Sequence, residues 1–190
     1  LVKLDSYNSQ GLPGATFRIA KIQDGTHYLD RITDMNGEIN ISDLEPGVYS
    51  VVEMDAPEGY VKDHHEYHVE LFPGQISELV VSNDRMPNLE ILKTDAITGK
   101  PVEGVTFTVK RVDSSTLTTV TSDANGRCFL EKLMPGVYEI WEQSVPDGYL
   151  LNEEHQLITL FPNRTGTVQF QNYPKPTLTV NKIDSITADP

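Results

Sequence analysis

The sequence is poor in cysteine, in basic residues and in long hydrophobic runs. Its single cysteine, Cys128, excludes any disulfide within the chain, so the fold must be stabilised by packing or by another kind of bond. Only 15 Lys and Arg residues stand against 28 Asp and Glu, and the net charge of -13 argues against nucleic acid or an anionic membrane as partner. No apolar run is long enough for a transmembrane helix. At 190 residues and 38% hydrophobic content, a globular protein of two domains is expected.

The most informative feature of the chain is an internal repeat. The stretch "NGEINISDLEPGVYSVVEMDAPEGY" (36–60) recurs as "NGRCFLEKLMPGVYEIWEQSVPDGY" (125–149), an offset of 125 − 36 = 89. The openings "KLDSYNSQGLPGATF" and "KTDAITGKPVEGVTF" begin at Lys3 and Lys93, an offset of 93 − 3 = 90. The two offsets differ by one residue, which a surface loop can absorb. Two homologous domains are therefore predicted.

A third opening, "LTVNKIDSITADP", begins at residue 178. We therefore predict one repeat domain at 1–86, a second at 87–174, and a linker followed by the start of a third, truncated repeat at 175–190. On this interpretation the chain is a slice of a longer array of repeats.

Local patterns within each repeat favour strands. Short alternating runs such as "GVTFTVKRV", "GVYEIWE" and "GTVQFQN" are separated by turn residues, among them Asn36-Gly37, Pro46-Gly47 and Pro73-Gly74 in the first copy. No helical period is evident. The fold class predicted is all-β: two tandem Ig-like β-sandwiches end to end, plus the first strand of a third.

Three polar residues of the second copy fall where the strand pattern expects apolar ones. Side chains alternate between the two faces of a strand, so in "LEILKTD" (89–95) Lys93 shares a face with leucine and isoleucine. Glu142 shares a face with Tyr138 and an isoleucine, and Asn172 ends the run "VQFQN" in the same register. The first copy repeats all three positions, as Lys3, Glu53 and Asn83. Each repeat is thus predicted to hold a lysine, a glutamate and an asparagine in one apolar interior.

An isolated charge buried in such an interior costs several kcal/mol or shifts its pKa until it is neutral, so the three groups must meet. One outcome is a buried Lys–Glu ion pair with an amide bonded to it, which contributes little stability because desolvation offsets the attraction. The other outcome is chemical. Burial makes the lysine amine neutral and nucleophilic, the glutamate polarises the asparagine carbonyl and shuttles protons, and ammonia leaves as an isopeptide bond forms.

The motifs "KTDAITGKPVEGVTF", "GVYEIWEQSVPDGY" and "VQFQN" resemble the Cna protein B-type (SpaA-like, prealbumin-like) repeats of Gram-positive surface adhesins and pilins. The first copy carries "KLD", "GVYSVVEMDAPEGY" and "LVVSN" in the same order. The resemblance implies that a first-strand lysine is joined to a last-strand asparagine beside an acidic residue. It assigns the crosslinks Lys3–Asn83, with Glu53 as proton shuttle, and Lys93–Asn172, with Glu142.

The function implied is a structural stalk or spacer of a cell-wall-anchored adhesin or pilin, located outside the cell on a Gram-positive surface. The alternative is a module that binds a host ligand. The only chemistry expected is autocatalytic crosslinking, so the chain is not predicted to be an enzyme, and neither a cofactor nor a metal is expected. The predicted partners are neighbouring repeats of the same chain and, through parts outside this sequence, host extracellular matrix or other pilin subunits, with no nucleic acid and no membrane.

Two further candidates receive the simpler interpretation. "HHEYH" places His64, Glu66 and His68 as a conceivable metal trio, but the second copy reads "EEHQL" there, so an exposed edge strand is expected. Cys128 aligns with Ile39 of the first copy, which favours a small buried apolar residue over a reactive thiol.

Three residues outside the two triads remain. Trp141 falls on the face opposite Glu142 and is expected to be partly exposed. The "YPK" at 173–175 resembles a pilin motif in which Lys175 would join another subunit, although an ordinary linker is the preferred interpretation. Lys182 has no matching glutamate or asparagine and is expected to stay unlinked.

Overall fold

The computed structural model describes residues 1–23 and 28–182, and all the regular structure in them is β-strand, as the sequence predicts. The chain divides into two compact units, and the two β-sandwiches are described separately. Within these residues no helix is long and apolar enough to cross a membrane.

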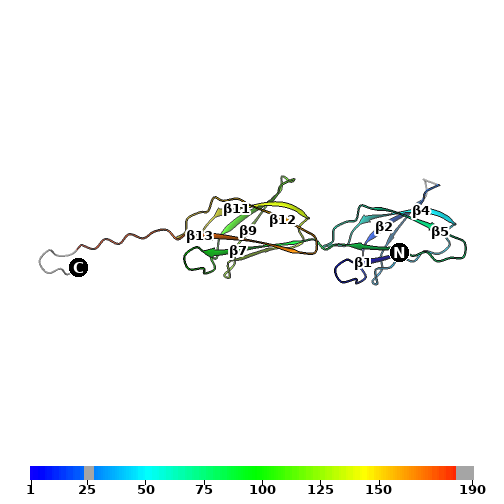
Figure 1. Cartoon of the computed structure of the whole chain (residues 1–190), viewed down its shortest axis with the longest axis horizontal. Helices are drawn as coiled ribbons and strands as arrows, with labels where there is room; N and C mark the ends of the chain where they lie inside the picture. The colour runs from blue at the N-terminus through cyan, green and yellow to red at the C-terminus, as the bar shows by residue number, and fades with distance from the viewer. Residues whose placement is uncertain (24–27, 183–190) are drawn as a thin grey trace. The chain divides into compact units, whose positions relative to one another are not determined.

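The described residues of the first sandwich form six strands in two sheets. Figure 1 shows how these strands are arranged. A parallel pair joins the first strand of the repeat to its last, in the order β1-β6, and a four-stranded sheet has the order β3-β2-β4-β5. The strands are β1 (Val2–Asp5), β2 (Thr16–Lys21), β3 (Tyr28–Ile32), β4 (Gly47–Asp55), β5 (Glu66–Leu71) and β6 (Val80–Asn83).

The second sandwich repeats this plan with one more strand. Its first and last strands are neighbours in a sheet of order β10-β7-β13, and its other sheet has the order β12-β11-β8-β9. The strands are β7 (Asn88–Asp95), β8 (Thr106–Arg111), β9 (Leu117–Thr121), β10 (Arg127–Leu130), β11 (Gly136–Ser144), β12 (Gln156–Leu160) and β13 (Thr165–Asn172).

The predicted turns lie where the backbone needs a left-handed conformation. Gly37 has a φ of 80° and its counterpart Gly126 has 68°. At a second turn, Gly74 (71°) is replaced in the other copy by Asn163 (62°), and asparagine is among the few side-chain-bearing residues that tolerate this region. The two copies thus make the same turn with different residues.

Alternation along the strands builds the core of each sandwich. Residues along strand β7 alternate between half-buried and buried, and the buried ones include Leu89 and Ile91. Strand β4 does the same, with Tyr49 and Val51 facing inward. Because this alternation continues without a break, the next inward position on each of these strands is a charged residue, and the strand cannot turn it outward without exposing the rest of its apolar face.

The segment that follows the second sandwich forms no strand within residues 175–182. Leu178, Val180 and Lys182 are exposed there. A strand needs a neighbour for its ladder of hydrogen bonds, and the described part of this segment pairs with none. The rest of the predicted third repeat, residues 183–190, lies outside the described residues.

Candidate functional site

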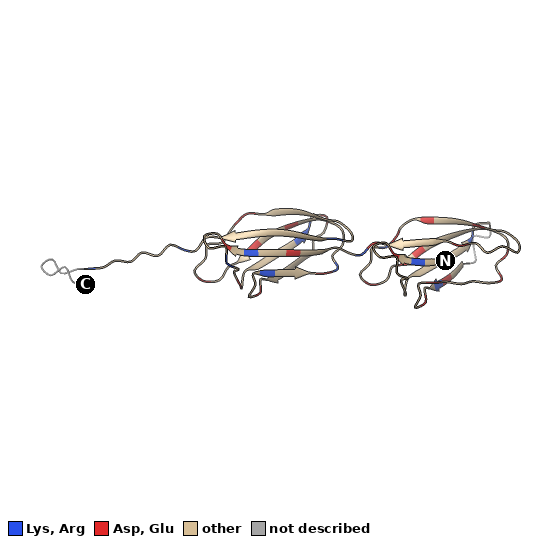
Figure 2. Ribbon diagram, turned by 60° about the horizontal axis from the view of Figure 1, so that its bottom comes forward, with Lys and Arg blue, Asp and Glu red and all other residues tan. Residues whose placement is uncertain are grey.

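The six polar residues singled out in the sequence form two buried triads, one inside each sandwich. None is more than 4% exposed, although each belongs to a residue type that is normally at the surface. They are Lys3, Glu53, Asn83, Lys93, Glu142 and Asn172. Basic and acidic bands that lie within strands are visible in each sandwich in Figure 2.

In the first sandwich the glutamate lies between the lysine and the asparagine. Lys3 Nζ forms an ion pair with Oε1 of Glu53 at 3.1 Å. The other carboxylate oxygen, Oε2, accepts a hydrogen bond of 2.9 Å from Nδ2 of Asn83. One carboxylate therefore contacts both the amine and the amide nitrogen.

The second sandwich has the same arrangement with a looser ion pair. Lys93 Nζ lies 3.6 Å from Oε1 of Glu142 and donates a hydrogen bond of 3.2 Å to the carbonyl of Thr94. Nδ2 of Asn172 donates to Oε2 of Glu142 at 2.8 Å. The two triads therefore agree in which atom faces which, while the Nζ–Oε1 distance differs by half an ångström (3.6 − 3.1).

Strand geometry explains how the three residues meet. Lys3 lies on β1 and is paired with Val81 of β6, two residues before Asn83, so the lysine and the asparagine lie diagonally across a parallel pair. Glu53 on β4 stands opposite Phe17, and a β-bulge follows it directly. Glu142 likewise stands opposite a phenylalanine and precedes a bulge. Bulges re-aim side chains, and here both follow the glutamate of the triad.

The orientation of the amide corrects one part of the sequence-based expectation. The glutamate was predicted to hydrogen-bond the asparagine carbonyl, but it bonds the amide nitrogen instead. The reason is that a second acceptor faces the same side: Nδ2 of Asn83 also donates to the Val61 carbonyl (2.8 Å), and Nδ2 of Asn172 to the Leu150 carbonyl (2.6 Å). With both acceptors on the nitrogen side, Oδ1 of each asparagine is buried without a hydrogen-bond partner.

Burial lowers the pKa of Lys3 below the ordinary lysine value, although the Glu53 charge acts in the opposite direction. Lys93 is affected in the same way, with burial lowering its pKa and Glu142 raising it. Both amines therefore lose their proton more readily than a surface lysine. A neutral amine is the form that can attack a carbonyl carbon.

The sequence reasoning missed the loop that completes each triad. The backbone amide of Asp63 donates to Oε2 of Glu53 at 2.6 Å, and that of Asn152 donates to Oε2 of Glu142 at 3.0 Å. This loop also supplies the carbonyls that hold the asparagines. Side-chain alternation cannot reveal such contacts, because they are made by the main chain of a loop.

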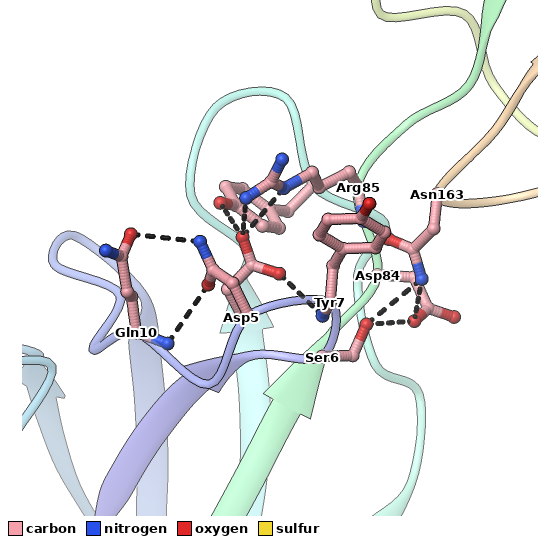
Figure 3. A network of polar contacts seen from close by, with 9 residues as sticks. Asp5, Ser6, Tyr7, Gln10, Asp84, Arg85 and Asn163 are labelled. Atoms are coloured by element: carbon pink, nitrogen blue, oxygen red, sulfur yellow. Dashed lines mark hydrogen bonds and ion pairs between the residues drawn. The ribbon is translucent and has the colours of Figure 1, made fainter.

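A tyrosine and an aspartate at the end of the first strand were also missed. In the first sandwich the hydroxyl of Tyr60 donates to Oδ2 of Asp5 at 2.8 Å. Arg85 donates to the same oxygen at 2.7 Å (Figure 3). In the second, the hydroxyl of Tyr149 donates to Oδ2 of Asp95 at 2.9 Å. A signal was present, since both copies carry "K-x-D" at the start and "P-x-G-Y" after the glutamate.

Burial by itself would raise the pKa of Asp5, but hydrogen bonds from the Tyr7 amide, Arg85 and Tyr60 lower it below its ordinary value. Hydrogen bonds from the amides of Thr98 and Ile97 lower the pKa of Asp95 in the same direction. Both carboxylates are therefore ionised acceptors at neutral pH.

The weaker candidates lie where the simpler interpretation put them. Strand β5 is an edge strand, and Nε2 of its exposed His68 lies 3.4 Å from Oε1 of Glu66, while His64 precedes the strand. Among residues 1–23 and 28–182 no three potential ligands gather as a metal site would require. Cys128 is buried, so the prediction of a buried core residue is confirmed, and this burial raises the pKa of its thiol to about 11.

Trp141 is partly exposed, as expected, and its ring stacks on that of His155 with centroids 4.9 Å apart. The side chains of Lys175 and Lys182 are exposed. The backbone of Lys175 donates to the carbonyl of Gly148 at 2.7 Å, so this part of the "YPK" segment is tied to its own sandwich.

A groove of about 450 Å³ opens at one end of the first sandwich, away from the triad. Its walls include Leu44, Phe72, Ile76 and Leu79, and none of the lysine, glutamate or asparagine residues of the triad lines it. The triads themselves are enclosed by the core, so the groups within reach of each lysine are those of its own sandwich.

Comparison with protein families gives one clear match. The model described as "SpaA: Prealbumin-like fold domain" matches residues 1–85 and again 87–174, which together are nearly the whole chain. Among curated proteins no relative matches.

Several solved structures are similar. A streptococcal ancillary pilin is 24% identical with a TM-score of 0.51, and the match covers 93% of this chain and 61% of that one. The shaft pilin SpaA from Lactobacillus rhamnosus GG is 16% identical with a TM-score of 0.55, covering 94% and 97%. The Bacillus anthracis TIE protein is 26% identical with a TM-score of 0.49, covering 91% and 33%. The chain thus spans a third of the TIE protein and about three fifths of the ancillary pilin, and the pilin likenesses establish the fold.

Proposed function

The chain belongs to the family of SpaA prealbumin-like fold domains, whose members are structural rather than enzymatic, and on that premise we propose that it is a load-bearing stalk segment of a Gram-positive surface protein. The parent would be a pilus shaft or an adhesin anchored to the cell wall. Residues 1–86 and 87–174 are its two domains, and the segment from 175 links to a further repeat. Neighbouring repeats or pilin subunits are the partners that the pilin likenesses support.

We further propose that each sandwich closes on itself by an isopeptide bond, Lys3 to Asn83 and Lys93 to Asn172. The observation that supports this is the buried triad in each repeat, with lysine on the first strand and asparagine on the last. A buried ion pair alone would contribute little to the stability of the sandwich, because the cost of desolvating the two charges offsets most of their attraction. Forming the bond removes the lysine charge altogether.

The geometry suggests how the proton moves. Oε1 of the glutamate faces the lysine and takes a proton from the ammonium, which leaves a neutral amine. The amine attacks Cγ of the asparagine, and Oε2, which faces Nδ2, delivers a proton to the departing nitrogen. The Nζ–Cγ bond forms, the Cγ–Nδ2 bond breaks, and ammonia leaves with the proton that the carboxylate first took from the ammonium. Nζ loses a second proton as it becomes an amide nitrogen, and the carboxylate takes this proton and ends as glutamic acid.

Such a bond determines how the sandwich carries tension. Between Lys3 and Asn83 the chain advances 83 − 3 = 80 residues, and between Lys93 and Asn172 it advances 172 − 93 = 79. Force that enters on the first strand and leaves on the last would pass through the covalent bond, and the residues between would carry none of it. An unlinked sandwich could release those residues, roughly 270 Å of extended chain.

Single-molecule pulling on the chain by its ends tests the proposal. We expect no lengthening from within either sandwich of the wild-type chain up to the force at which the handles fail. The matched variants Asn83→Ala and Asn172→Ala should each restore one extension step of about 270 Å. Two such steps in the wild-type chain would contradict the proposal.

A further inference from the structure

In both sandwiches a short loop lies beside the strand that carries the asparagine. In the first, the backbone amide of Val61 donates to the carbonyl of Asp84 (2.8 Å), and the amide of Met86 donates back to the carbonyl of Gly59 (2.8 Å). We call this loop, residues 57–61, the clamp loop of the first sandwich. It is bound to the chain immediately after Asn83.

The clamp loop of the second sandwich, residues 146–150, is held in the same way. The amide of Leu150 donates to the carbonyl of Tyr173 (3.0 Å), and the amide of Lys175 donates to the carbonyl of Gly148 (2.7 Å). This loop is therefore bound to the chain immediately after Asn172.

The opposite side of each clamp loop is attached to the lysine strand by one side-chain hydrogen bond. The hydroxyl of Tyr60 donates to Asp5, which is two residues after Lys3. Tyr149 reaches Asp95, two residues after the other lysine. Each loop thus spans from the strand of the nucleophile to the strand of the amide.

The same loops touch the reacting amide itself. The carbonyl of Val61, next to Tyr60, accepts from Asn83, and the carbonyl of Leu150, next to Tyr149, accepts from Asn172. Losing the tyrosine contact would detach the loop that carries this carbonyl from the lysine strand and leave it held only to the chain after the asparagine. A displacement of about 1 Å at a reacting group can cost on the order of a hundredfold in rate.

We propose that Tyr60 and Tyr149 are positioning residues for isopeptide formation: through Asp5 and Asp95 they fix the clamp loop against the lysine strand and so align the asparagine amide with the amine. This inference deepens the proposed function and rests on it. The two sandwiches differ in the contacts of this aspartate, and the test below uses the difference. Asp5 is also held by Arg85, whereas the second copy has Pro174 at the position aligned with Arg85. In the first sandwich the chain that follows Asn83, to which the clamp loop is bound, is therefore itself attached to Asp5.

The test is a time course of bond formation in each repeat. The full chain is synthesised in a cell-free system, samples are quenched in acid and denaturant, and peptide mass mapping reports the linked fraction of each repeat. Tyr149→Phe should slow bond formation in the second repeat by roughly tenfold or more and leave the first unchanged. Tyr60→Phe should slow the first repeat by a smaller factor, because Arg85 still holds Asp5.

Two further variants keep the test decisive. Asp95→Asn retains a hydrogen-bonding partner for the Tyr149 hydroxyl and should form its bond at nearly the wild-type rate, whereas Asp95→Ala should be as slow as Tyr149→Phe. A positioning role also predicts that Tyr149→Phe lowers the rate by one constant factor across the pH profile, because Lys93 and Glu142 are untouched. Circular dichroism of the purified variant and its resistance to protease, recorded on protein that was not quenched, show whether the second sandwich is folded.

The outcomes separate the two claims. Folded Tyr149→Phe that links its second repeat at the wild-type rate would overturn the positioning role while the bond itself stood. Equal rates for Asp95→Asn and Asp95→Ala would overturn it as well, and so would a change in the shape of the pH profile. If the wild-type chain never loses ammonia, the proposed crosslink fails, and this inference fails with it.

Discussion

The two sandwiches share the atoms that would react but differ in their surroundings. Both place a glutamate with one oxygen toward lysine and the other on the asparagine nitrogen, and both leave the asparagine Oδ1 buried and unpaired. Around this common centre, the residue whose amide supports the glutamate is Asp63 in the first copy and Asn152 in the second. The lysine, glutamate and asparagine that both copies share are the groups that bond formation would require. The residues around them, which differ between the copies, should determine how fast the bond forms.

The clearest difference between the copies is the side chain whose backbone amide supports the glutamate, which is charged in the first copy and neutral in the second. Asp63 lies close enough to Lys3 to raise the pKa of its amine, whereas Asn152 is neutral. Asp63 is itself held by the hydroxyl of Tyr67 at 2.6 Å, an interaction that, after burial, helps raise the pKa of this tyrosine to about 12. The second negative charge that acts on the lysine is therefore that of Asp63 in the first site and that of Asp95 in the second.

The largest effect is expected when one sandwich loses its bond and the other keeps it. Asn83→Ala and Asn172→Ala should each lower the free energy of unfolding of their own sandwich by about 4 to 5 kcal/mol, because a loop of roughly 80 residues is no longer closed in the unfolded chain. Denaturant unfolding measured for each repeat checks this. Lys93→Met is the control for the second sandwich, because it removes the bond without removing the asparagine hydrogen bonds. Unchanged midpoints in all three variants would contradict the crosslink.

Removing a glutamate should stop the chemistry in one copy only. Glu142→Ala should leave the second sandwich folded without its bond, and Glu142→Gln should slow the reaction by roughly 10² to 10⁴, the usual contribution of a positioned acid or base. Mass spectra taken over several days should show one ammonia lost instead of two. A Glu142→Ala chain that still loses both would remove the glutamate from the mechanism.

Exchanging Asp63 and Asn152, whose amides support the glutamates, should make the rates of bond formation in the two copies more alike. Asp63→Asn takes a negative charge away from Lys3, so more of its amine is neutral, and we expect the first bond to form faster by a factor of about ten or less at neutral pH. Asn152→Asp should slow the second bond to a similar degree. The time course described above measures both, and the unmodified repeat of each variant is the internal control. Rates that shift together, or in the opposite direction, would refute the electrostatic explanation.

The smallest effect expected is a change of stability with pH. It is small because the Glu142 charge offsets part of the lowering of the Lys93 pKa that burial causes. In Asn172→Ala the amine stays free, and burial holds its pKa below the ordinary lysine value of 10.5. Between the lowered pKa and 10.5 the unfolded chain binds more protons than the folded one, so the stability of the second sandwich should rise with pH across that window. Denaturant titrations at a series of pH values check this. The wild-type chain, in which Lys93 would be an amide, should lack the rise, and a fall in the variant would contradict the assignment.

The sequence predicted the strands, the two sandwiches and the burial of all six triad residues, because strand alternation relates each position directly to a face. Lys93 could be placed beside Leu89 and Ile91 from spacing alone. The amide orientation could not, because it depends on the carbonyls of Val61 and Leu150 in a loop without periodicity. The contact between Tyr60 and Asp5 was missed for the same reason, since it joins residues 55 positions apart outside any strand pair.

The measurement closest to the central claim is the intact mass of the purified, fully denatured wild-type chain. If each buried triad joins its lysine to its asparagine, the mass falls short of the sequence value by two molecules of ammonia, and peptide mapping finds Lys3 joined to Asn83 and Lys93 joined to Asn172. A chain that has the full sequence mass after prolonged folding at neutral pH would contradict the account, because the triads would then be ordinary buried ion pairs.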